Sequence, residues 1–329
     1  MARKSYTRKT SRGGKIQPAQ MTLTFATPTV AGGATESFYI DLSQVASLVN
    51  RRFYRQGINW AVGGFKFLTP SGFTGQISVN KLPNTWVMSN AWEKTFRAWQ
   101  RQQREALDDG MQESIKAKYN DFKIFADPLH LTKGFGANLL PVSVGDHAVA
   151  GTAVAGEWEP SQIVIPNFGA PGVNFEPFLT AVGAKVGGAG GSYPLTSLYA
   201  DSRSTPQSPD PAVPGDVLST DNVLNLMFDV GDNNTDVLAN VVGKNDELPY
   251  DQDIYPGQPG NLEGLAIHSI ENVSGTTIGG TTRIKGGNFP CGLISIDAVN
   301  TGTTANLVIQ VDLVPGNHRG YLCEPMTEM

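Results

Sequence analysis

Six cations stand within the first fifteen residues, with no acidic residue among them. They are Arg3, Lys4, Arg8, Lys9, Arg12 and Lys15, and the first carboxylate of the chain is Glu36. Such cations, spaced by serine, threonine and glycine, suit a polyphosphate, because each neutralised phosphate releases counter-ions and no base has to be read. This composition cannot bury a core. Residues 1–19 are therefore predicted to form a disordered nucleic-acid-binding arm; the alternatives are a solubilising tail or a cleaved targeting peptide.

A second set of cations is predicted on a helix over residues 91–107, where apolar residues recur at helical spacing. Asn90, with Glu93 three residues later, fits a capping box. Three aromatic residues share one face of this helix, as core residues do: Trp92, Phe96 and Trp99. Four cations share the opposite face: Lys94, Arg97, Arg101 and Arg104. Such a stripe is usually a solvated face, and a second nucleic-acid contact is the alternative.

Acidic residues gather in two predicted loops. The first contains Asp229, Asp232 and Asp236, and the second contains Asp246, Glu247, Asp251 and Asp253. Oxygen-rich loops suit a hard cation such as Ca²⁺, which subunits of an assembly could share. The spacing is not that of an EF-hand, so solvated turn residues are the alternative. No other cofactor is expected.

The motifs of common catalytic sites do not occur in the sequence. The four histidines are scattered and none has metal-ligand spacing: His130, His147, His268 and His318. No GxSxG elbow or phosphate-binding loop occurs. Cys291 and Cys323 lie far apart, which indicates a reducing compartment and no zinc site. We expect no enzymatic activity, although a pair of glycosidase carboxylates needs only spatial proximity and stays an open alternative.

Charge is segregated along the 329-residue chain. Residues 16–329 hold 19 cations against 30 acidic residues, a formal charge of −11, behind the basic arm. A protein that bound nucleic acid over its folded surface would more often carry positive charge there. No run of eighteen apolar residues occurs, so we expect no membrane span.

The elements that must position these residues are mostly strands. Alternating or β-prone segments predict strands at 20–27, 37–41, 58–69, 75–82, 162–166, 262–269, 291–299 and 305–314. The strands at 58–69 and 75–82 are predicted to form a hairpin, with a bulge or bend at Gly63-Gly64. Asp41 would cap a short helix at 42–49. Arg51, Arg52 and Arg55 follow it, either as an extension of a basic inner surface or as a solvated loop.

Many strands, one substantial helix and long irregular segments favour an all-β fold, an antiparallel β-sandwich of the jelly-roll type. Residues 20–329 show no linker, so they are predicted to form a single domain with long surface loops at about 183–216 and 245–261. In this fold the first strand, at 20–27, would pair with the last, at 305–314. The arm would leave the sandwich beside this pair.

The segment 81–103 (KLPNTWVMSNAWEKTFRAWQRQQ) resembles capsid proteins of small circular single-stranded DNA viruses that encode a replication-initiator protein. The similarity is most specific in Leu82-Pro83-Asn84-Thr85-Trp86 and in the residues from Asn90 to Lys94. The resemblance implies one jelly roll per subunit, about sixty copies in an icosahedral shell (T = 1), and an arm that holds the single-stranded DNA genome inside. It implies a place in the virion, assembly in the host nucleus, and no enzymatic activity.

Two other classes of protein stay open. A small RNA virus could use a capsid protein of the same architecture with a different cargo. A secreted or phage-borne β-sandwich that binds or cleaves carbohydrate would need an exposed aromatic platform or a pair of acids. For a coat protein, the two long loops would be the expected contacts with a host receptor, which the sequence does not identify.

Overall fold

The computed structural model describes residues 18–109, 121–142, 152–165, 171–172, 174–186, 191–203, 240, 264–276 and 280–329. The chain divides into two compact units. Unit 1 comprises Met1–Asn84, Gly136–Glu159 and Ile267–Met329, and unit 2 comprises Thr85–Phe135 and Pro160–Ala266. Because the chain passes between the units more than once, no single linker separates them.

The first sheet of unit 1 has the strand order β1-β10-β3, with β8 and the short β13 also paired to β3. Its strands are β1 (Thr22–Ala26), β3 (Ile58–Leu68), β8 (Thr281–Phe289), β10 (Val308–Leu313) and β13 (Cys323–Pro325). In the antiparallel ladder between β1 and β10, Leu23 lies opposite Val311 and Phe25 opposite Ile309. The predicted pairing of the first strand with the last long strand is confirmed.

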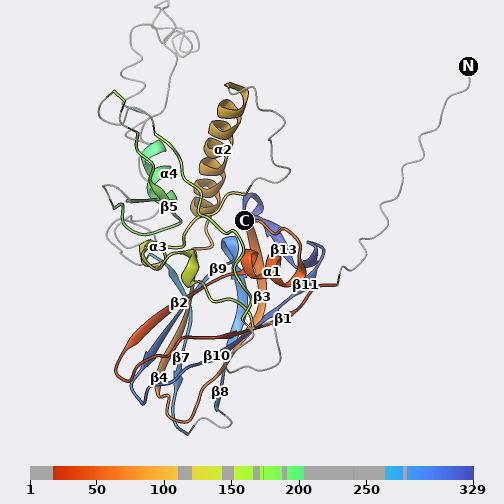
Figure 1. Cartoon of the computed structure of the whole chain (residues 1–329), viewed down its shortest axis with the longest axis vertical. Coiled ribbons are helices and arrows are strands. Elements are labelled where there is room, and N and C mark those ends of the chain that lie inside the picture. The colour runs from red at the N-terminus through yellow and green to blue at the C-terminus, as the bar shows by residue number, and fades with distance from the viewer. Residues whose placement is uncertain are drawn as a thin grey trace, which may run out of the picture. The chain divides into compact units, whose positions relative to one another are not determined.

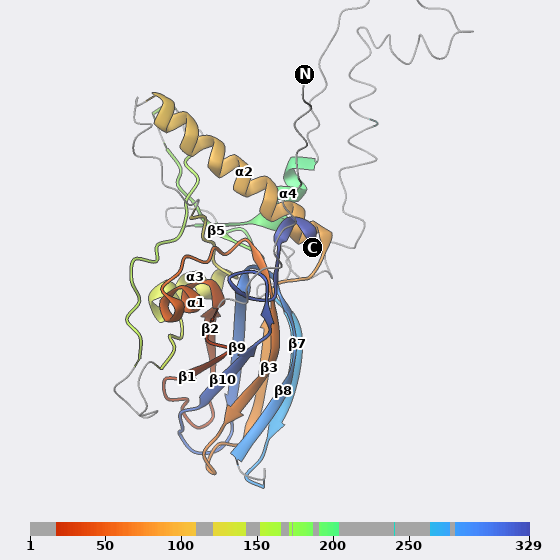
Figure 2. The same ribbon diagram turned by 90° about the vertical axis from the view of Figure 1, so that its right-hand side faces the viewer.

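The second sheet of unit 1 has the strand order β2-β9-β4-β7. Its strands are β2 (Thr35–Asp41), β4 (Gly75–Lys81), β7 (Ala266–Val273) and β9 (Leu293–Asn300). Strand β9 pairs antiparallel with both β2 and β4, so that Ile296 lies between Phe38 and Val79. The two antiparallel sheets pack together as a β-sandwich (Figures 1 and 2), which confirms the predicted all-β class.

Alternate side chains of both sheets form the core of the sandwich. Several large side chains there are completely buried: Phe25, Ile40, Trp60, Phe67, Ile77 and Phe289. Strands of a sandwich present every second residue to the interior, where removal of apolar area from water stabilises the fold. The predicted strands include every one of these positions except Phe289, which lies on β8, a strand that the sequence analysis missed.

The predicted hairpin is wrong, because β3 and β4 lie in different sheets. A turn between two alternating strands has the same local sequence whether the second strand pairs with the first or crosses to the facing sheet. The long-range partners decide: β3 lies between β8 and β10, and β4 lies beside β9. The predicted bulge is confirmed, since the register between β10 and β3 shifts at Gly63, where Asp312 lies opposite Gly64 and Leu313 opposite Val62.

Helix α1 (Leu42–Asn50) confirms the predicted short helix. The Asp41 carboxylate caps it, because Oδ1 accepts hydrogen bonds from the amides of Ser43 and Gln44 at 2.9 and 3.3 Å. Near the same end of the sandwich lie β11 (Pro315–Gly316) and β12 (Gly320–Tyr321), which form a small antiparallel pair (Figure 1). Short 3₁₀ turns occupy Phe135–Ala137, Pro290–Gly292 and Met326–Glu328.

Unit 2 contains three helices and one short parallel strand pair among its described residues. The helices are α2 (Trp86–Asp109), α3 (Pro128–Lys133) and α4 (Leu195–Arg203), and the strands are β5 (Phe178–Thr180) and β6 (Ser192–Pro194). Two predictions are wrong here. The segment 192–203, expected within a loop, forms β6 and α4; the segment 162–166, expected as a strand, makes only isolated bridges at Gln162 and Ile165. In both, tertiary contacts override local propensity.

Helix α2 begins at Trp86, five residues before the predicted start. The Thr85 hydroxyl accepts from the Met88 amide at 3.4 Å, whereas Asn90 lies inside the helix and donates its Nδ2 to the Trp86 carbonyl at 2.9 Å. The predicted capping box at Asn90 is therefore wrong. Thr85 and Asn90 are both residue types that cap helices, so residue type alone did not distinguish them.

Candidate nucleic-acid interface

Most of the cations predicted to bind nucleic acid lie at the start of the chain, outside the described residues. The arm cations Arg3, Lys4, Arg8, Lys9, Arg12 and Lys15 belong to this part. The predicted calcium ligands Asp229, Asp232 and Asp236, the second acidic group at 246–253 and the loop at 245–261 also lie outside the described residues. Within the described residues, no cluster of three or more histidine, cysteine or acidic residues could hold a metal ion.

The aromatic face of α2 is a packing face, as predicted. Trp92 and Phe96 are buried, at 3 % and 8 % exposure, and their rings stack with centroids 4.8 Å apart. Trp99 extends the stack, and Phe122 packs against all three rings at 5.4 to 6.1 Å. This cluster holds α2 within unit 2, while the four cations of the opposite face are exposed.

The cations of α2 are exposed, and two of them pair with acids on the same helix. Arg97 Nε lies 2.5 Å from Glu93 Oε1, and Arg101 Nε lies 2.7 Å from Glu105 Oε1. The arginine side chains of these pairs are 74 % and 81 % exposed, so each pair contributes little stability. Lys94 and Arg104 lie on the same exposed stripe. The structure thus brings the four predicted cations to one surface and lowers its net charge through Glu93 and Glu105.

A second basic surface lies at the end of α1, where the basic N-terminal residues join the sandwich. Arg51 caps the C-terminus of α1 in a left-handed backbone conformation (φ 54°), which ends the helix. Arg52 Nη1 donates to the carbonyls of Pro18, at 3.1 Å, and Arg319, at 3.4 Å. Arg51 and Arg55 are exposed. Because Pro18 lies three residues after Lys15, the last arm cation, these arginines lie at the root of the arm.

Residues from the other end of the sequence complete this surface. Arg319 donates Nη1 to the Phe53 carbonyl, and its guanidinium lies 6.0 Å from the centre of the Tyr54 ring. The Tyr54 hydroxyl donates in return to the Arg319 carbonyl at 2.9 Å. We call Arg51, Arg52, Arg55 and Arg319 the arm-root cluster. Sequence analysis missed Arg319, because the turn between β11 and β12 carries no local signal of a partner more than 260 residues away.

The electrostatic character of the arm-root cluster is positive. Within the described residues, no salt bridge involves Arg51, Arg52 or Arg55. Burial lowers the pKa of the neighbouring His318, and the positive charges of Arg319 and Arg55 lower it further. His318 is therefore neutral at pH 7, and the charge comes from the guanidinium groups. Such a group of arginines can bind phosphates without reading bases.

We expect the arm-root cluster to contribute to the salt dependence of nucleic-acid binding. The double substitution Arg51→Gln/Arg55→Gln removes two exposed charges and should lower the slope of log K against log salt for a single-stranded oligonucleotide by about 1.4. The matched control is Arg283→Gln/Lys285→Gln, which removes two exposed cations from β8. Oligonucleotide titrations of the unassembled protein at several salt concentrations measure both slopes, and equal slopes for the two variants would contradict a special role of the cluster.

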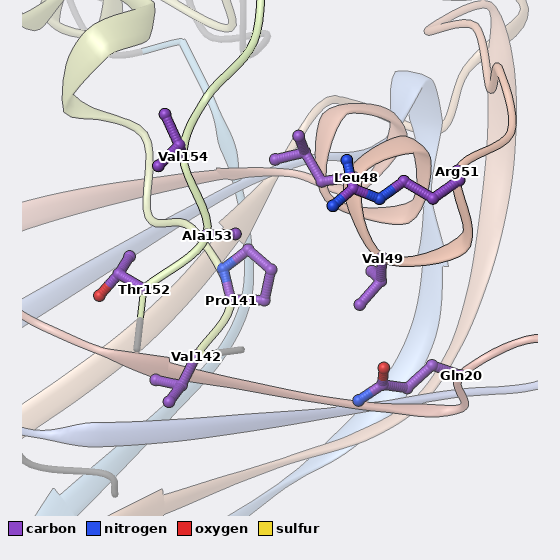
Figure 3. Close-up of a pocket in the computed structure, with 9 residues that line it drawn as sticks. All are labelled: Gln20, Leu48, Val49, Arg51, Pro141, Val142, Thr152, Ala153 and Val154. Atoms are coloured by element: carbon purple, nitrogen blue, oxygen red, sulfur yellow. The ribbon is translucent and has the colours of Figure 1, made fainter. Parts of the chain in front are cut away.

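A pocket of about 500 Å³ adjoins the arm-root cluster (Figure 3). Leu48, Val49 and Arg51, from the end of α1, line one side, and residues 141–142 and 152–154 line the other, with Gln20 beside β1. Six of the nine described lining residues are apolar, and Arg51 is the one charged residue among these nine. The carbonyl end of α1 also faces this region, which is unfavourable for an anion. The pocket therefore gives no indication of a particular ligand.

A buried carboxylate organises the opposite end of α1. Asp41 is completely buried, and its Oδ2 accepts from Gln56 Nε2 at 2.7 Å and from Trp158 Nε1 at 3.1 Å, in addition to the two amides at Oδ1. Burial raises the pKa of Asp41 to about 6, although the four hydrogen bonds act to lower it. Asp41 thus joins three separate segments of unit 1 at a cost in desolvation.

The described histidines and the cysteines have structural surroundings. His130 is buried and accepts the Ala126 amide at Nδ1, and the Nε2 of His268 lies 2.8 Å from the Lys285 carbonyl. Both cysteines are free thiols, and burial raises the pKa of Cys323 to about 12. The His268 ring thus has a hydrogen-bond partner in the structure and lies on a strand, as an ordinary structural histidine does. His147 lies outside the described residues.

No helix among the described residues is long and apolar enough to cross a membrane. Comparison of the chain with protein-family models, with curated proteins and with solved structures gives no match.

Proposed function

We propose that this chain is the coat protein of a virus: it assembles into a closed icosahedral shell, and its basic N-terminal residues hold single-stranded DNA inside. The observation that carries the proposal is the pairing of eight strands. Strand β1 pairs with β10, β2 with β9 and β3 with β8, and β4 lies beside β7. Among these eight strands, the first thus pairs with the last, the second with the second-last, and so on inward to β4 and β7.

This nested pairing supports a jelly roll. In that fold one long hairpin of four strand pairs folds over, so that successive strands alternate between the two sheets. Here β1, β3, β8 and β10 lie in one sheet and β2, β4, β7 and β9 in the other. In the sequence, both parts of unit 2 lie between β4 and β7, at the middle of the nested hairpin. The segment Gly136–Glu159, which belongs to unit 1, separates these two parts. Jelly rolls form viral shells, but also lectin domains, so the fold alone does not determine function.

The distribution of positive charge supports a nucleic-acid cargo. Six cations without an acid precede β1, and the arm-root cluster lies where they join the sandwich. The remaining chain is acidic overall, which keeps the body of a subunit from collapsing onto nucleic acid. In sixty copies, the six arm charges would neutralise on the order of 360 phosphates, so other cations must neutralise the rest of a kilobase-sized genome.

Electron microscopy of the purified full-length protein tests the proposal, with nuclease treatment and the ratio of absorbance at 260 and 280 nm measured alongside. We expect uniform closed particles that protect nucleic acid from nuclease. Digestion of the extracted cargo by deoxyribonuclease or by ribonuclease then separates a DNA cargo from the RNA cargo of the alternative capsid class. A well-folded monomer with a protein-like absorbance ratio at every salt concentration would exclude a coat protein.

Deletion of residues 2–15 tests the role of the arm separately. The shortened protein should fold and assemble, because β1 begins at Thr22 and Pro18 keeps its contact with Arg52. The particles should lose most of their nucleic acid, because the six cations are gone. The matched control replaces residues 2–15 by an uncharged glycine-serine segment of equal length, which should behave like the deletion. Full retention of cargo by both variants would contradict packaging by the arm.

A further inference from the structure

A large aromatic side chain lies exposed on the same face of α2 as the basic stripe. Trp86 is 40 % exposed, in contrast to the buried Trp92 on the packing face. Arg97 and Arg104 follow Trp86 by eleven and eighteen positions, which correspond to about three and five whole helical turns. The first residue of α2 thus adds an aromatic surface to a line of cations.

Tyr199 of α4 and Lys94 of α2 complete this surface. The rings of Trp86 and Tyr199 have centroids 6.5 Å apart and planes at 86°, an edge-to-face contact. Lys94 Nζ lies 5.9 Å from the centroid of the Tyr199 ring. Trp86 is 40 % exposed and Lys94 is also exposed, so aromatic surface lies open beside a positive charge.

Exposed tryptophan with adjacent cations is the arrangement that binds single-stranded nucleic acid without sequence preference. Every base has a π-face that can stack on an aromatic ring, and the cations neutralise the phosphates on either side. Arg97 and Arg101 contact their acids through Nε and are 74 % and 81 % exposed, so their terminal guanidinium nitrogens can reach a phosphate. A neutral sugar would use the aromatic ring but would gain nothing from the cations.

We propose that Trp86, with Tyr199 and Lys94, is a stacking site for an unpaired base, and that the adjoining cations of α2 hold its phosphates. This inference rests on the proposed function in one respect, that the cargo is single-stranded nucleic acid. It assigns unit 2 a direct contact with that cargo, independent of the arm.

The test compares two oligomers of equal charge on the full-length protein: a twelve-residue deoxythymidine strand and an abasic strand of the same length. Binding is measured by fluorescence anisotropy at about 0.3 M salt, where phosphate contacts by the arm are weakened. Trp86→Ala should lower affinity for the thymidine strand about tenfold and leave affinity for the abasic strand unchanged. Trp86→Phe keeps an aromatic ring and should retain most of the affinity.

The matched control is Leu129→Ala, which truncates an apolar side chain of unit 2. Leu129 is 39 % exposed, about the same exposed fraction as Trp86. This variant should bind both strands like the unchanged protein. If Trp86→Ala does not fold, Trp86→Phe still provides a test. The thymidine strand should quench the intrinsic tryptophan fluorescence of the unchanged protein, and Trp86→Phe should remove the part of this quenching that comes from Trp86. Unchanged quenching would count against stacking.

The outcomes separate this inference from the proposed function. Binding of both strands with no effect of Trp86→Ala, or with an equal loss for both, overturns the stacking site and leaves a cargo held by phosphate contacts. Binding of neither strand overturns the stacking site together with the nucleic-acid cargo. Binding of a neutral oligosaccharide that depends on Trp86, without binding of the thymidine strand, overturns the inference in favour of a carbohydrate-binding sandwich.

Discussion

Replacement of Trp60 by alanine should lower the free energy of unfolding of the sandwich by about 4 kcal/mol, the upper part of the range for large-to-small changes in a core. Trp60 lies on β3 and is completely buried. Its ring lies 5.8 Å from that of Tyr54 and 5.4 Å from that of Tyr321, centre to centre. Alanine would leave a cavity that three ordered segments cannot fill without moving.

The same substitution should disturb the arm-root cluster. The Tyr54 hydroxyl holds the Arg319 carbonyl, and the Tyr321 hydroxyl donates to the Gln20 carbonyl at 2.7 Å, so both tyrosines link the core to this surface. Urea unfolding of the unassembled protein, followed by far-UV circular dichroism, measures the loss of stability. Trp60→Phe is the matched control and should cost only about 1 kcal/mol. This small cost is expected because Trp60 Nε1 has no hydrogen-bond partner among the described residues. Equal costs for the two variants would contradict the role of ring packing.

The second large effect is a gain of stability in mild acid that depends on Asp41. Burial raises the pKa of Asp41 from 3.8 to about 6. A carboxyl group whose pKa is higher in the folded state binds a proton more tightly there than in the unfolded chain. Its contribution to stability is therefore fully present below about pH 3.8 and is lost as the pH rises through 6. The contribution amounts to about 3 kcal/mol at 1.36 kcal/mol per pH unit.

The variant Asp41→Asn isolates this effect. Asparagine keeps an oxygen that can cap α1, but it does not titrate, so other carboxyl groups act alike in both proteins. The difference in unfolding free energy between the unchanged protein and Asp41→Asn should shift in favour of the unchanged protein by about 2 kcal/mol from pH 7 to pH 4. The exposed Asp312 provides a control through Asp312→Asn. A difference that stays constant across this range would show that Asp41 is not the titrating group.

Local patterns predicted the elements of the sandwich well, because they depend on neighbours in the chain. The alternation in 20–27 and 305–314 identified β1 and β10 and their interior faces. Asp41 before an apolar helical pattern identified α1 and its cap. These patterns report which side of each element is apolar, and burial of apolar area then selects that side for the core.

Local patterns did not decide which of two suitable residues caps a helix, or which strands pair. Thr85, and not Asn90, caps α2, because the helix continues past Asn90 to Trp86, and the Asn90 side chain donates to the Trp86 carbonyl inside it. Strands β3 and β4 were predicted as neighbours, but each has long-range partners in its own sheet. Pairing of this kind depends on contacts that the intervening sequence does not encode.

The sequence by itself determined the segregation of charge, the predominance of antiparallel β-strands and the apolar face of β1. Those properties follow from composition and from the period of two residues along a strand. Only the tertiary structure decided that Arg319 joins Arg52 at the root of the arm, and that Tyr199 lies against Trp86 beside the cations of α2. The physical reason is that each of these surfaces forms from segments far apart in the chain, and the packing of the core, not local propensity, brings them together.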